Sequence, residues 1–186
     1  MTRNEGQASV ILDNVCKLIQ KKVHADNVLL VEKFAKALYS NMSKEDLAHR
    51  NDSDLYGAAL SLWNSLEKNN SDDAVVRVFN PEVAKDGWQS SHTIVEIIAK
   101  DMPFLVDSVR MAMTRENISS HLLLHSPLKI QRDKNAKITG ISSLKAEQES
   151  TSTKTVFFIE IDRQTDAKVI ESFKKELESV LVDVSI

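Results

Sequence analysis

The sequence is poor in the residues that form special chemical sites or special backbone turns. Its 186 residues include one cysteine, four glycines and three prolines. The single cysteine, Cys16, excludes an internal disulfide and is typical of a protein that works in a reducing cytoplasm. With so few glycines, and with no Gly-x-Gly-x-x-Gly pattern, the chain has no recognisable turn for binding a dinucleotide. We therefore expect no cofactor site within these residues.

Strong charge and long apolar runs are also missing. The formal net charge is −3 at pH 7, too small to indicate a surface for nucleic acid or for anionic membranes. No apolar stretch approaches the roughly 20 residues of a membrane helix, and the first residues lack the apolar core of a signal peptide. The composition, 42% hydrophobic and 27% charged, is that of a folded soluble protein, and we expect a cytoplasmic one.

Residues 1–72 have the periodicity of helices. Apolar side chains recur every three or four residues in three stripes, and the last stripe predicts a helix over residues 52–68. The stripes are Ile11, Val15, Leu18 and Ile19; Leu30, Phe34 and Leu38; and Leu55, Ala59, Leu62 and Leu66. A polar cluster at residues 69–73 follows and predicts a turn. We place a boundary there, between a helical segment (1–72) and a second unit (73–186).

In the second unit the apolar period shortens to two, as in β-strands. The pattern predicts strands at 75–79, 92–99, 121–132 and 154–162 and helices at 103–116 and 166–182, the last with Val169, Phe173, Leu177 and Val180 on its buried face. From residue 92 this is the βαββαβ order of a ferredoxin-like α+β fold, with an antiparallel sheet, helices on one face, and a last strand that is short or missing. Either strand 75–79 fills that sheet edge or the chain stops inside a longer polypeptide, and in both cases we expect a domain truncated at its C-terminal end.

One face of the predicted sheet mixes apolar side chains with carboxylates. On strand 154–162, alternate residues would face a core under the helices, whereas Phe158 and Glu160 would face the other way. Carboxylates on that face, Glu96, Glu160 and Asp162, raise the alternative of acid–base catalysis, but such a mixed surface more often serves for docking. We therefore predict no catalytic residue. The predicted interface residues are Ile94, Glu96, Ile98, His121, Leu123, His125, Phe158 and Glu160.

His121 and His125 raise the question of a metal site. Two histidines four positions apart bind one ion when they share a helix face, but residues 121–132 have the pattern of a strand. Four residues of strand span roughly 13 Å, which is too far for one ion. We therefore predict no metal site, and we expect these histidines to pack against a neighbouring domain in a pH-dependent way.

Several short stretches resemble, in the same order, the amino-terminal region of the large bacterial NAD-specific glutamate dehydrogenases. The densest are residues 101–109 (DMPFLVDSV) and 121–133 (HLLLHSPLKIQRD). Residues 54–59, 80–81, 87–90, 92–97 and 158–164 add to the pattern, so that the resemblance covers most of residues 54–183. In that family an ACT-like domain precedes the catalytic part of the polypeptide.

The resemblance implies a non-catalytic piece of a larger enzyme. The full-length enzyme would convert glutamate to 2-oxoglutarate and ammonium with NAD, whereas this fragment would serve regulation, oligomer contacts or both. Its partners would be the downstream domains of the same polypeptide, further copies of itself and an amino-acid effector. The alternative is a freestanding amino-acid-sensing or scaffolding ACT-like module, and the open reading frame after Ile186 would separate the two.

The resemblance also implies where an effector would bind, namely the loop between strand 92–99 and helix 103–116. The candidate residues are Asp101, Phe104, Asp107 and Ser108. Amides at the helix start would receive the ligand's carboxylate. The alternative is simple helix capping by Asp101 or Met102, with Pro103 in the first turn. Phe104 stands where ligand-binding ACT domains usually have glycine, and we expect its ring to cover the loop or to fill the core.

Overall fold

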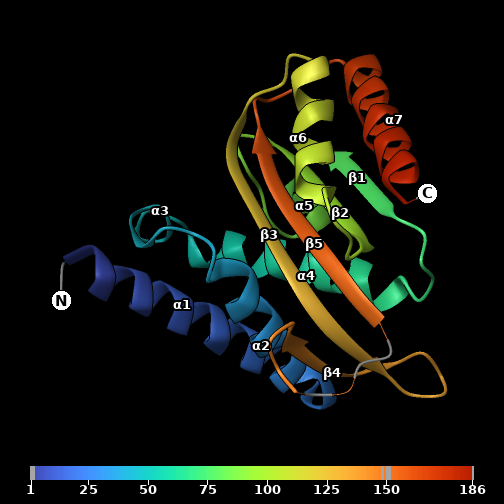
Figure 1. Ribbon diagram of the computed structural model, residues 1–186. Helices are drawn as coiled ribbons and strands as arrows, with labels where there is room; N and C mark the ends of the chain where they lie inside the picture. Colours follow the sequence, from blue (N-terminus) through green and yellow to red (C-terminus); the bar gives the residue numbers. More distant parts are fainter. Residues whose placement is uncertain (1–2, 148, 150–151, 186) are drawn as a thin grey trace.

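A computed structural model describes residues 3–147, 149 and 152–185 of the chain (Figure 1). Its centre is a five-stranded antiparallel sheet in the order β1-β2-β5-β3-β4, with helices on both faces. The strands are β1 (Val75–Phe79), β2 (Thr93–Lys100), β3 (Ser120–Arg132), β4 (Ile138–Ser143) and β5 (Ser152–Ile161). The helices are α1 (Arg3–Lys22), α2 (Val28–Tyr39), α3 (Lys44–Ala48), α4 (Asp52–Lys68), α5 (Val83–Asp86), α6 (Leu105–Arg115) and α7 (Ala167–Val184), with a 3-10 turn at Ala25–Asn27. The predicted α+β fold is confirmed.

Helices α1–α4 form a layer of their own, which we call the helical segment. α4 begins where the side chain of Asn51 accepts a hydrogen bond from the backbone amide of Ser53 (2.9 Å), as a helix cap should. The predicted apolar stripes are buried within this layer except at Leu18 and Leu30, which are half-buried. Phe34 meets Trp63 edge to face with ring centroids 5.8 Å apart. The layer lies across one side of the sheet (Figure 1).

Strand β1 fills the sheet edge beside β2. It pairs antiparallel with β2 from Val75 opposite Ile98 to Phe79 opposite Ile94. In a ferredoxin-like fold this position belongs to the last strand of the βαββαβ order. Of the two alternatives for that edge, the structure therefore shows the first, in which a strand from before the βαββαβ unit completes the sheet.

Strand β4 was not predicted from the sequence. It forms a hairpin with β3, whose pairing shifts between Gln131 and Arg132. Gly140 lies opposite Gln131, and a Cβ at this glycine would collide with the Gln131 side chain. A short strand with a central glycine and a pairing irregularity lacks the strict apolar alternation from which strands are predicted.

The two faces of the sheet have different covers. Helices α6 and α7 cover one face, here called the apolar face, where Val95, Ile97, Phe157 and Ile159 are buried as the alternation predicts. The helical segment covers the other, here called the mixed face, through contacts of α2 with β3 and β4 and of α4 with β2 and β5. Figure 1 shows the sheet sandwiched between these two layers. The face that the sequence suggested as a free docking surface is thus occupied by the chain itself.

The start of α6 differs from the prediction. The helix begins at Leu105, and the residue at its N-cap is Phe104 in the left-handed conformation, with φ of 64°. Asp101 is not the cap, because its carboxylate accepts a hydrogen bond from the hydroxyl of Thr155 on β5 (2.7 Å). The capping predicted for Asp101 or Met102 is therefore wrong, since a side-chain contact to the sheet competes for the carboxylate.

Helix α7 carries the predicted apolar stripe except at its first turn. Val169 is 40% exposed, whereas Phe173, Leu177, Val180 and Leu181 are buried. The prediction is therefore wrong for Val169 in the first turn, and the buried face of α7 also includes Leu181 near the other end of the helix. Among the described residues, no helix combines the length and the apolar character needed to cross a membrane.

Candidate functional site

The residues predicted to bind an effector lie around the start of α6. The amide of Ser108 donates to the carbonyl of Phe104 (2.9 Å) in the first helical turn, and Asp107 is exposed beside it. The ring of Phe104 is 76% exposed, so the expectation that it fills the core is wrong. The backbone of this exposed residue has the left-handed conformation, with φ of 64°. The role of the loop as an effector site stays a prediction.

The eight predicted interface residues do not share one surface. Ile94, Glu96, Ile98, Phe158 and Glu160 lie on the mixed face, and none of them is more than 3% exposed. Leu123 packs on the apolar face, His125 lies beside the ring of Phe157 there, and His121 is exposed near the start of β3. Within the described residues, the partner docked on the mixed face is the helical segment. The use of any of the eight in contacts with further domains stays a prediction.

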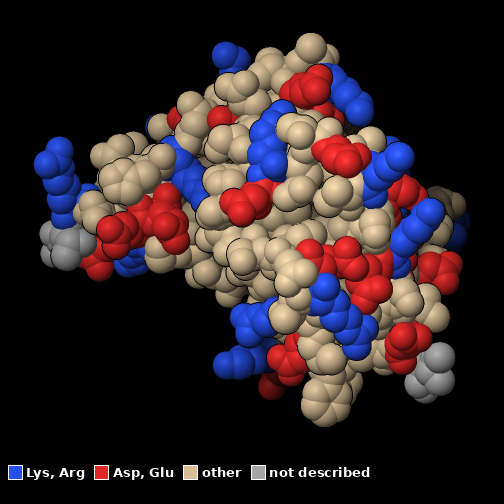
Figure 2. All heavy atoms as spheres, turned by 90° about the horizontal axis from the view of Figure 1, so that it is seen from above, with Lys and Arg blue, Asp and Glu red and all other residues tan. Residues whose placement is uncertain are grey.

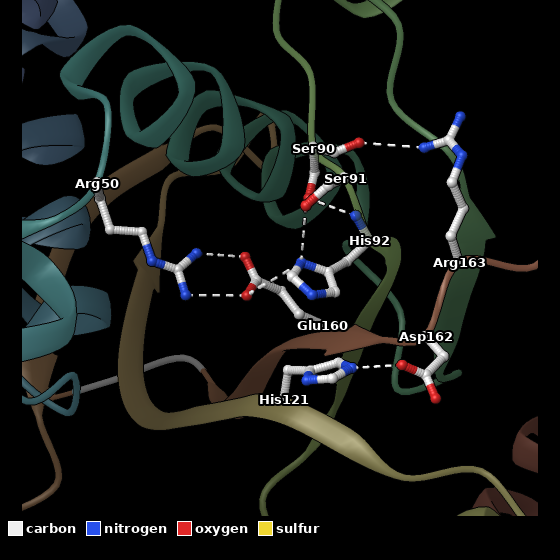
Figure 3. A network of polar contacts seen from close by, with 8 residues as sticks. All are labelled: Arg50, Ser90, Ser91, His92, His121, Glu160, Asp162 and Arg163. Atoms are coloured by element: carbon white, nitrogen blue, oxygen red, sulfur yellow. Dashed lines mark hydrogen bonds and ion pairs between the residues drawn. The ribbon is translucent and has the colours of Figure 1, made fainter.

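An ion pair joins the helical segment to the mixed face. Arg50, between α3 and α4, binds Glu160 on β5 through both terminal nitrogens, with Nη1 against Oε1 and Nη2 at 2.9 Å from Oε2 (Figure 3). Glu160 is almost fully buried, and a buried carboxylate needs such a partner. Burial opposes the charge of Arg50, but the hydrogen bond and the charge of Glu160 raise the pKa of this guanidinium above its usual value. The pair therefore fixes where the turn between α3 and α4 meets the sheet.

Two histidines extend this contact to the end of the sheet. The Nδ1 atom of His92 lies 3.8 Å from a carboxylate oxygen of Glu160, and its ring lies 4.5 Å from that of His121. His121 in turn contacts Asp162, with Nε2 and Oδ1 2.5 Å apart. Figure 3 shows the resulting row from Arg50 through Glu160, His92 and His121 to Asp162. We call these five residues the Arg50–Asp162 row.

The second buried carboxylate of the mixed face is Glu96. Its Oε2 accepts from Nη1 of Arg77 on β1 (2.7 Å), and the same nitrogen donates to the hydroxyl of Ser61 on α4 (3.0 Å). Burial raises the pKa of Glu96, although Ser61 and Arg77 act in the opposite direction. This contact holds the middle of α4 against the edge of the sheet.

A third buried charge, Lys154, belongs to the same face. Its ammonium donates to the carbonyl of Ser71 and lies 3.8 Å from a carboxylate oxygen of Asp72, in the turn that links the helical segment to β1. Burial lowers the pKa of Lys154. Each buried charge of the mixed face thus binds a group from the helical segment, the linking turn or the adjacent edge strand.

The charged residues of the mixed face form contacts between the helical segment and the sheet. The described residues include no group of three or more histidine, cysteine or acidic side chains placed to hold a metal ion. On the molecular surface seen in Figure 2, basic and acidic side chains are interspersed, and neither sign of charge forms a separate patch. The buried contacts of the mixed face fix where the helical segment and the linking turn meet the sheet.

Sequence reasoning missed the residues that complete these contacts. Glu96 and Glu160 were recognised as carboxylates on an apolar strand, which signals that partners exist. The partners Arg50, Arg77 and His92 stand 110, 19 and 68 positions from their respective carboxylates, and nothing local distinguishes them from solvated charges. The packing of the turn between α3 and α4 on the sheet brings Arg50 to Glu160. The pairing of β1 with β2 places Arg77 opposite Glu96, and the pairing of β2 with β5 brings His92 near Glu160.

The architecture defines the class of this protein: an ACT-like α+β domain with a helical layer on its second face. A family described as "Glutamate dehydrogenase, ACT1 domain" matches residues 34–177, and the chain belongs to this family of NAD-specific glutamate dehydrogenases. It corresponds to the N-terminal ACT-like region of such an enzyme. The match begins inside α2, and the division of the chain at residue 72 stays a prediction.

Two curated relatives are similar over most of this chain. The NAD-specific glutamate dehydrogenase of Halomonas elongata is 32% identical over 174 residues, covering 94% of the chain. The NAD-specific glutamate dehydrogenase of Pseudomonas aeruginosa is 37% identical over 153 residues, covering 82% of it. The chain spans only 11% and 9% of the lengths of these relatives. No solved structure matches it.

Proposed function

We propose that this chain is the non-catalytic regulatory and oligomerisation region of a large NAD-dependent glutamate dehydrogenase. The full-length enzyme would convert glutamate to 2-oxoglutarate and ammonium in the cytoplasm, with NAD bound by domains outside these residues. The observation that carries the proposal is the family match together with the small share of the relatives that the chain spans. The remaining nine-tenths of such a polypeptide is ample for the hydride chemistry.

Regulation would begin at the loop between β2 and α6. Asp101, Phe104, Asp107 and Ser108 surround the start of α6, whose first amides point out of the helix without intrahelical partners. An amino acid would place its carboxylate on these amides and its ammonium beside Asp107. The effector would act by binding two enzyme conformations with different affinity, since only that difference shifts an equilibrium.

The rigid contact across the sheet supports this proposal. β2 leads directly into the loop, and the same strand carries Glu96, which is bound by Arg77 and Ser61 through the mixed face. A ligand that reorients the end of β2 would therefore alter how α4 sits on the sheet. Oligomer contacts would use exposed surface of both layers.

The thermal midpoint of this chain against a panel of ligands tests the proposal. The panel contains the common amino acids, glutamate, 2-oxoglutarate and NAD at millimolar concentrations. We expect one amino acid to raise the midpoint in a concentration-dependent way, because a ligand that binds only the folded state stabilises it. Asp107→Ala should abolish the shift, whereas Asp52→Ala, the same change on the far layer, should preserve it.

Two results would contradict the proposal. If no amino acid shifts the thermal midpoint, the proposed effector site is contradicted, and the region would serve only for structural contacts. Glutamate-dependent NADH formation by the chain alone would show that the region is catalytic, and a shift with NAD would show that it binds the cofactor. Sedimentation of the chain at rising concentration tests the oligomer contact separately, since a monomer at all concentrations would rule out self-association through these residues.

A further inference from the structure

A cavity lies outside the loop and the Arg50–Asp162 row, along the outer side of α4. Its volume is about 680 Å³, within the range of small-molecule sites. One wall is α4, a second is β1, and the segment around Trp88 closes one side. The α4 wall presents Gly57, Ser61, Asn64, Ser65 and Lys68. Each of these residues is three or four positions from another of them, so they lie on one side of the helix.

Arg77 is the central charged group of this cavity. Glu96 and Ser61 both bind its Nη1, and its guanidinium carbon lies 4.3 Å from the centre of the Phe79 ring. Among the described residues, Nη2 and Nε of Arg77 have no hydrogen-bond partner. A guanidinium that is held in place on one side and unused on the other is a receptor for a carboxylate or phosphate, because its planar donors match two oxygens at once.

Two further cations stand at the ends of the cavity. Lys22, at the end of α1, lies 5.3 Å from the centre of the Tyr56 ring, and Lys68 is in the last turn of α4. Neither forms an ion pair with a described carboxylate. The single acidic residue of the lining, Asp86, is occupied by the backbone amide of Glu82 (2.9 Å). The cavity therefore has an excess of positive charge and unsatisfied donors.

The spacing of these cations indicates a ligand with two acidic groups. Ser61 is hydrogen-bonded to Arg77 and therefore shows where the guanidinium lies along α4. Lys68 follows Ser61 by seven residues, which corresponds to roughly 10 Å along the helix axis. Asn64 and Ser65 lie between them, and no described residue binds their side chains. A flexible lysine ammonium folds back over part of that distance, so an anion on Arg77 and a second anion toward Lys68 fit a short organic chain.

We propose that this cavity binds a small dicarboxylate, with one carboxylate on Arg77 and the other between Asn64 and Lys68. The site is separate from the loop at α6, because the cavity lies on the mixed face beside α4 whereas α6 packs on the apolar face. Because α4, β1 and the end of α1 all line it, the ligand would fasten the helical segment to the sheet edge. The dicarboxylate would thus act on the same contact between layers that Arg77 and Glu96 hold.

Isothermal titration of the chain with succinate and glutarate tests this site, with propionate, inorganic phosphate and AMP as comparisons. We expect saturable binding of at least one dicarboxylate and none of propionate. Lys68→Gln should weaken that binding about fivefold by removing one exposed charge. Arg77→Lys should weaken it about tenfold, because an ammonium replaces the two-pronged donor.

Matched controls keep the outcome interpretable. Lys85→Gln removes the same charge from exposed α5, outside the cavity lining, and should leave the dissociation constant unchanged. The thermal midpoint of Lys68→Gln without ligand should equal that of the parent chain, which excludes misfolding as the cause. Absence of dicarboxylate binding, binding only of phosphate or AMP, or equal affinity in the parent, Lys68→Gln and Arg77→Lys proteins would each overturn the proposal.

Discussion

The two faces of the sheet are buried to the same extent but by different means. On the apolar face, hydrocarbon side chains from β2 and β5 meet hydrocarbon side chains from α6 and α7. On the mixed face, the apolar packing of α2 and α4 is interrupted by the buried charges Glu96, Lys154 and Glu160. Apolar packing tolerates different side chains of similar total volume. The buried charges of the mixed face, in contrast, need their hydrogen-bonding partners in one particular arrangement.

This difference assigns separate roles to the two layers. Apolar burial supplies most of the free energy of folding and does not select a register. Buried ion pairs add little net stability, because desolvation offsets their attraction, but leaving one charge without its partner is costly. The charged contacts of the mixed face therefore determine the position in which the helical segment packs on the sheet. A ligand that binds near these contacts would act on the packing of the two layers.

The largest effect is expected from a pair of neighbouring residues that point to opposite faces. Phe157 and Phe158 are adjacent on β5 and both are buried. Phe157→Ala should lower the free energy of unfolding by about 3–5 kcal/mol, because it leaves a cavity in the core under α6 and α7. Phe158→Ala should first remove hydrogen-exchange protection from α1–α4 while β3 and β5 stay protected. Both are measured by denaturant unfolding and hydrogen exchange, and identical exchange patterns would show that the two faces form one cooperative unit.

The next effect separates charge pairing from apolar packing on the mixed face. Arg50→Ala should lower the free energy of unfolding by about 2–3 kcal/mol, because Glu160 is left buried without its bidentate partner. The double variant Arg50→Met with Glu160→Leu should lose less than the sum of the single changes, which a double-mutant cycle measures. Arg163→Ala, which removes an exposed hydrogen bond to Ser90 at the end of the Arg50–Asp162 row, serves as the control and should cost about 0.5 kcal/mol or less. Strict additivity would refute the coupling.

A smaller effect tests how closely the helical segment approaches the segment before β2. A Cβ on Gly57 would come 2.4 Å from the Cβ of Trp88, so α4 must shift to accept it. Gly57→Ala should cost about 1–3 kcal/mol through overpacking, in spite of the better helix propensity of alanine. Gly6→Ala in α1 meets nothing within 4 Å and should instead stabilise the chain by about 0.5–1 kcal/mol. Thermal midpoints measure both, and the same sign for the two changes would contradict the close contact.

The smallest expected effect is a pH dependence confined to the mixed face. Burial raises the pKa of Glu96 from its usual value of 4.5, so the folded protein holds this proton more tightly than the unfolded chain does. The contribution of this proton to the free energy of unfolding is fully present below pH 4.5, and it is lost as the pH rises through the raised pKa of Glu96. Glu96→Gln stays neutral at every pH, so the thermal midpoint of this variant should rise relative to that of the parent as the pH increases from 4.5 through the raised pKa of Glu96. A constant difference across this range would show that Arg77 compensates the burial of Glu96 fully.

Much of the fold was accessible from local patterns. The helix at residues 52–68 matches α4, and the alternation on β5 correctly assigned Phe157 and Ile159 to the core under α6 and α7. β4 was missed because Gly140 and the shifted pairing beside Gln131 break the strand pattern. The cap of α6 was misassigned because Asp101 binds Thr155, a residue of β5 that is distant in the sequence.

The candidate site was accessible only in part. Glu96 and Glu160 were identified as carboxylates on a surface built for docking, since charges on apolar strands require a partner. The partner was assigned to another domain, whereas α1–α4 of this chain occupy the surface. The cavity beside Arg77 had no sequence signal, because its donors come from α1, α4 and β1 and are ordinary polar residues in each.

The sequence by itself determined which segments are helices and strands, which strand residues face a core, and to which family the chain is similar. These properties follow from side-chain periodicity and short motifs, which act between residues close in the chain. Only the tertiary structure decided what covers the mixed face, which arginine meets which carboxylate, and that β1 completes the sheet. Those choices depend on contacts between residues far apart in the chain, where burial makes a charge need one particular partner that no local pattern specifies.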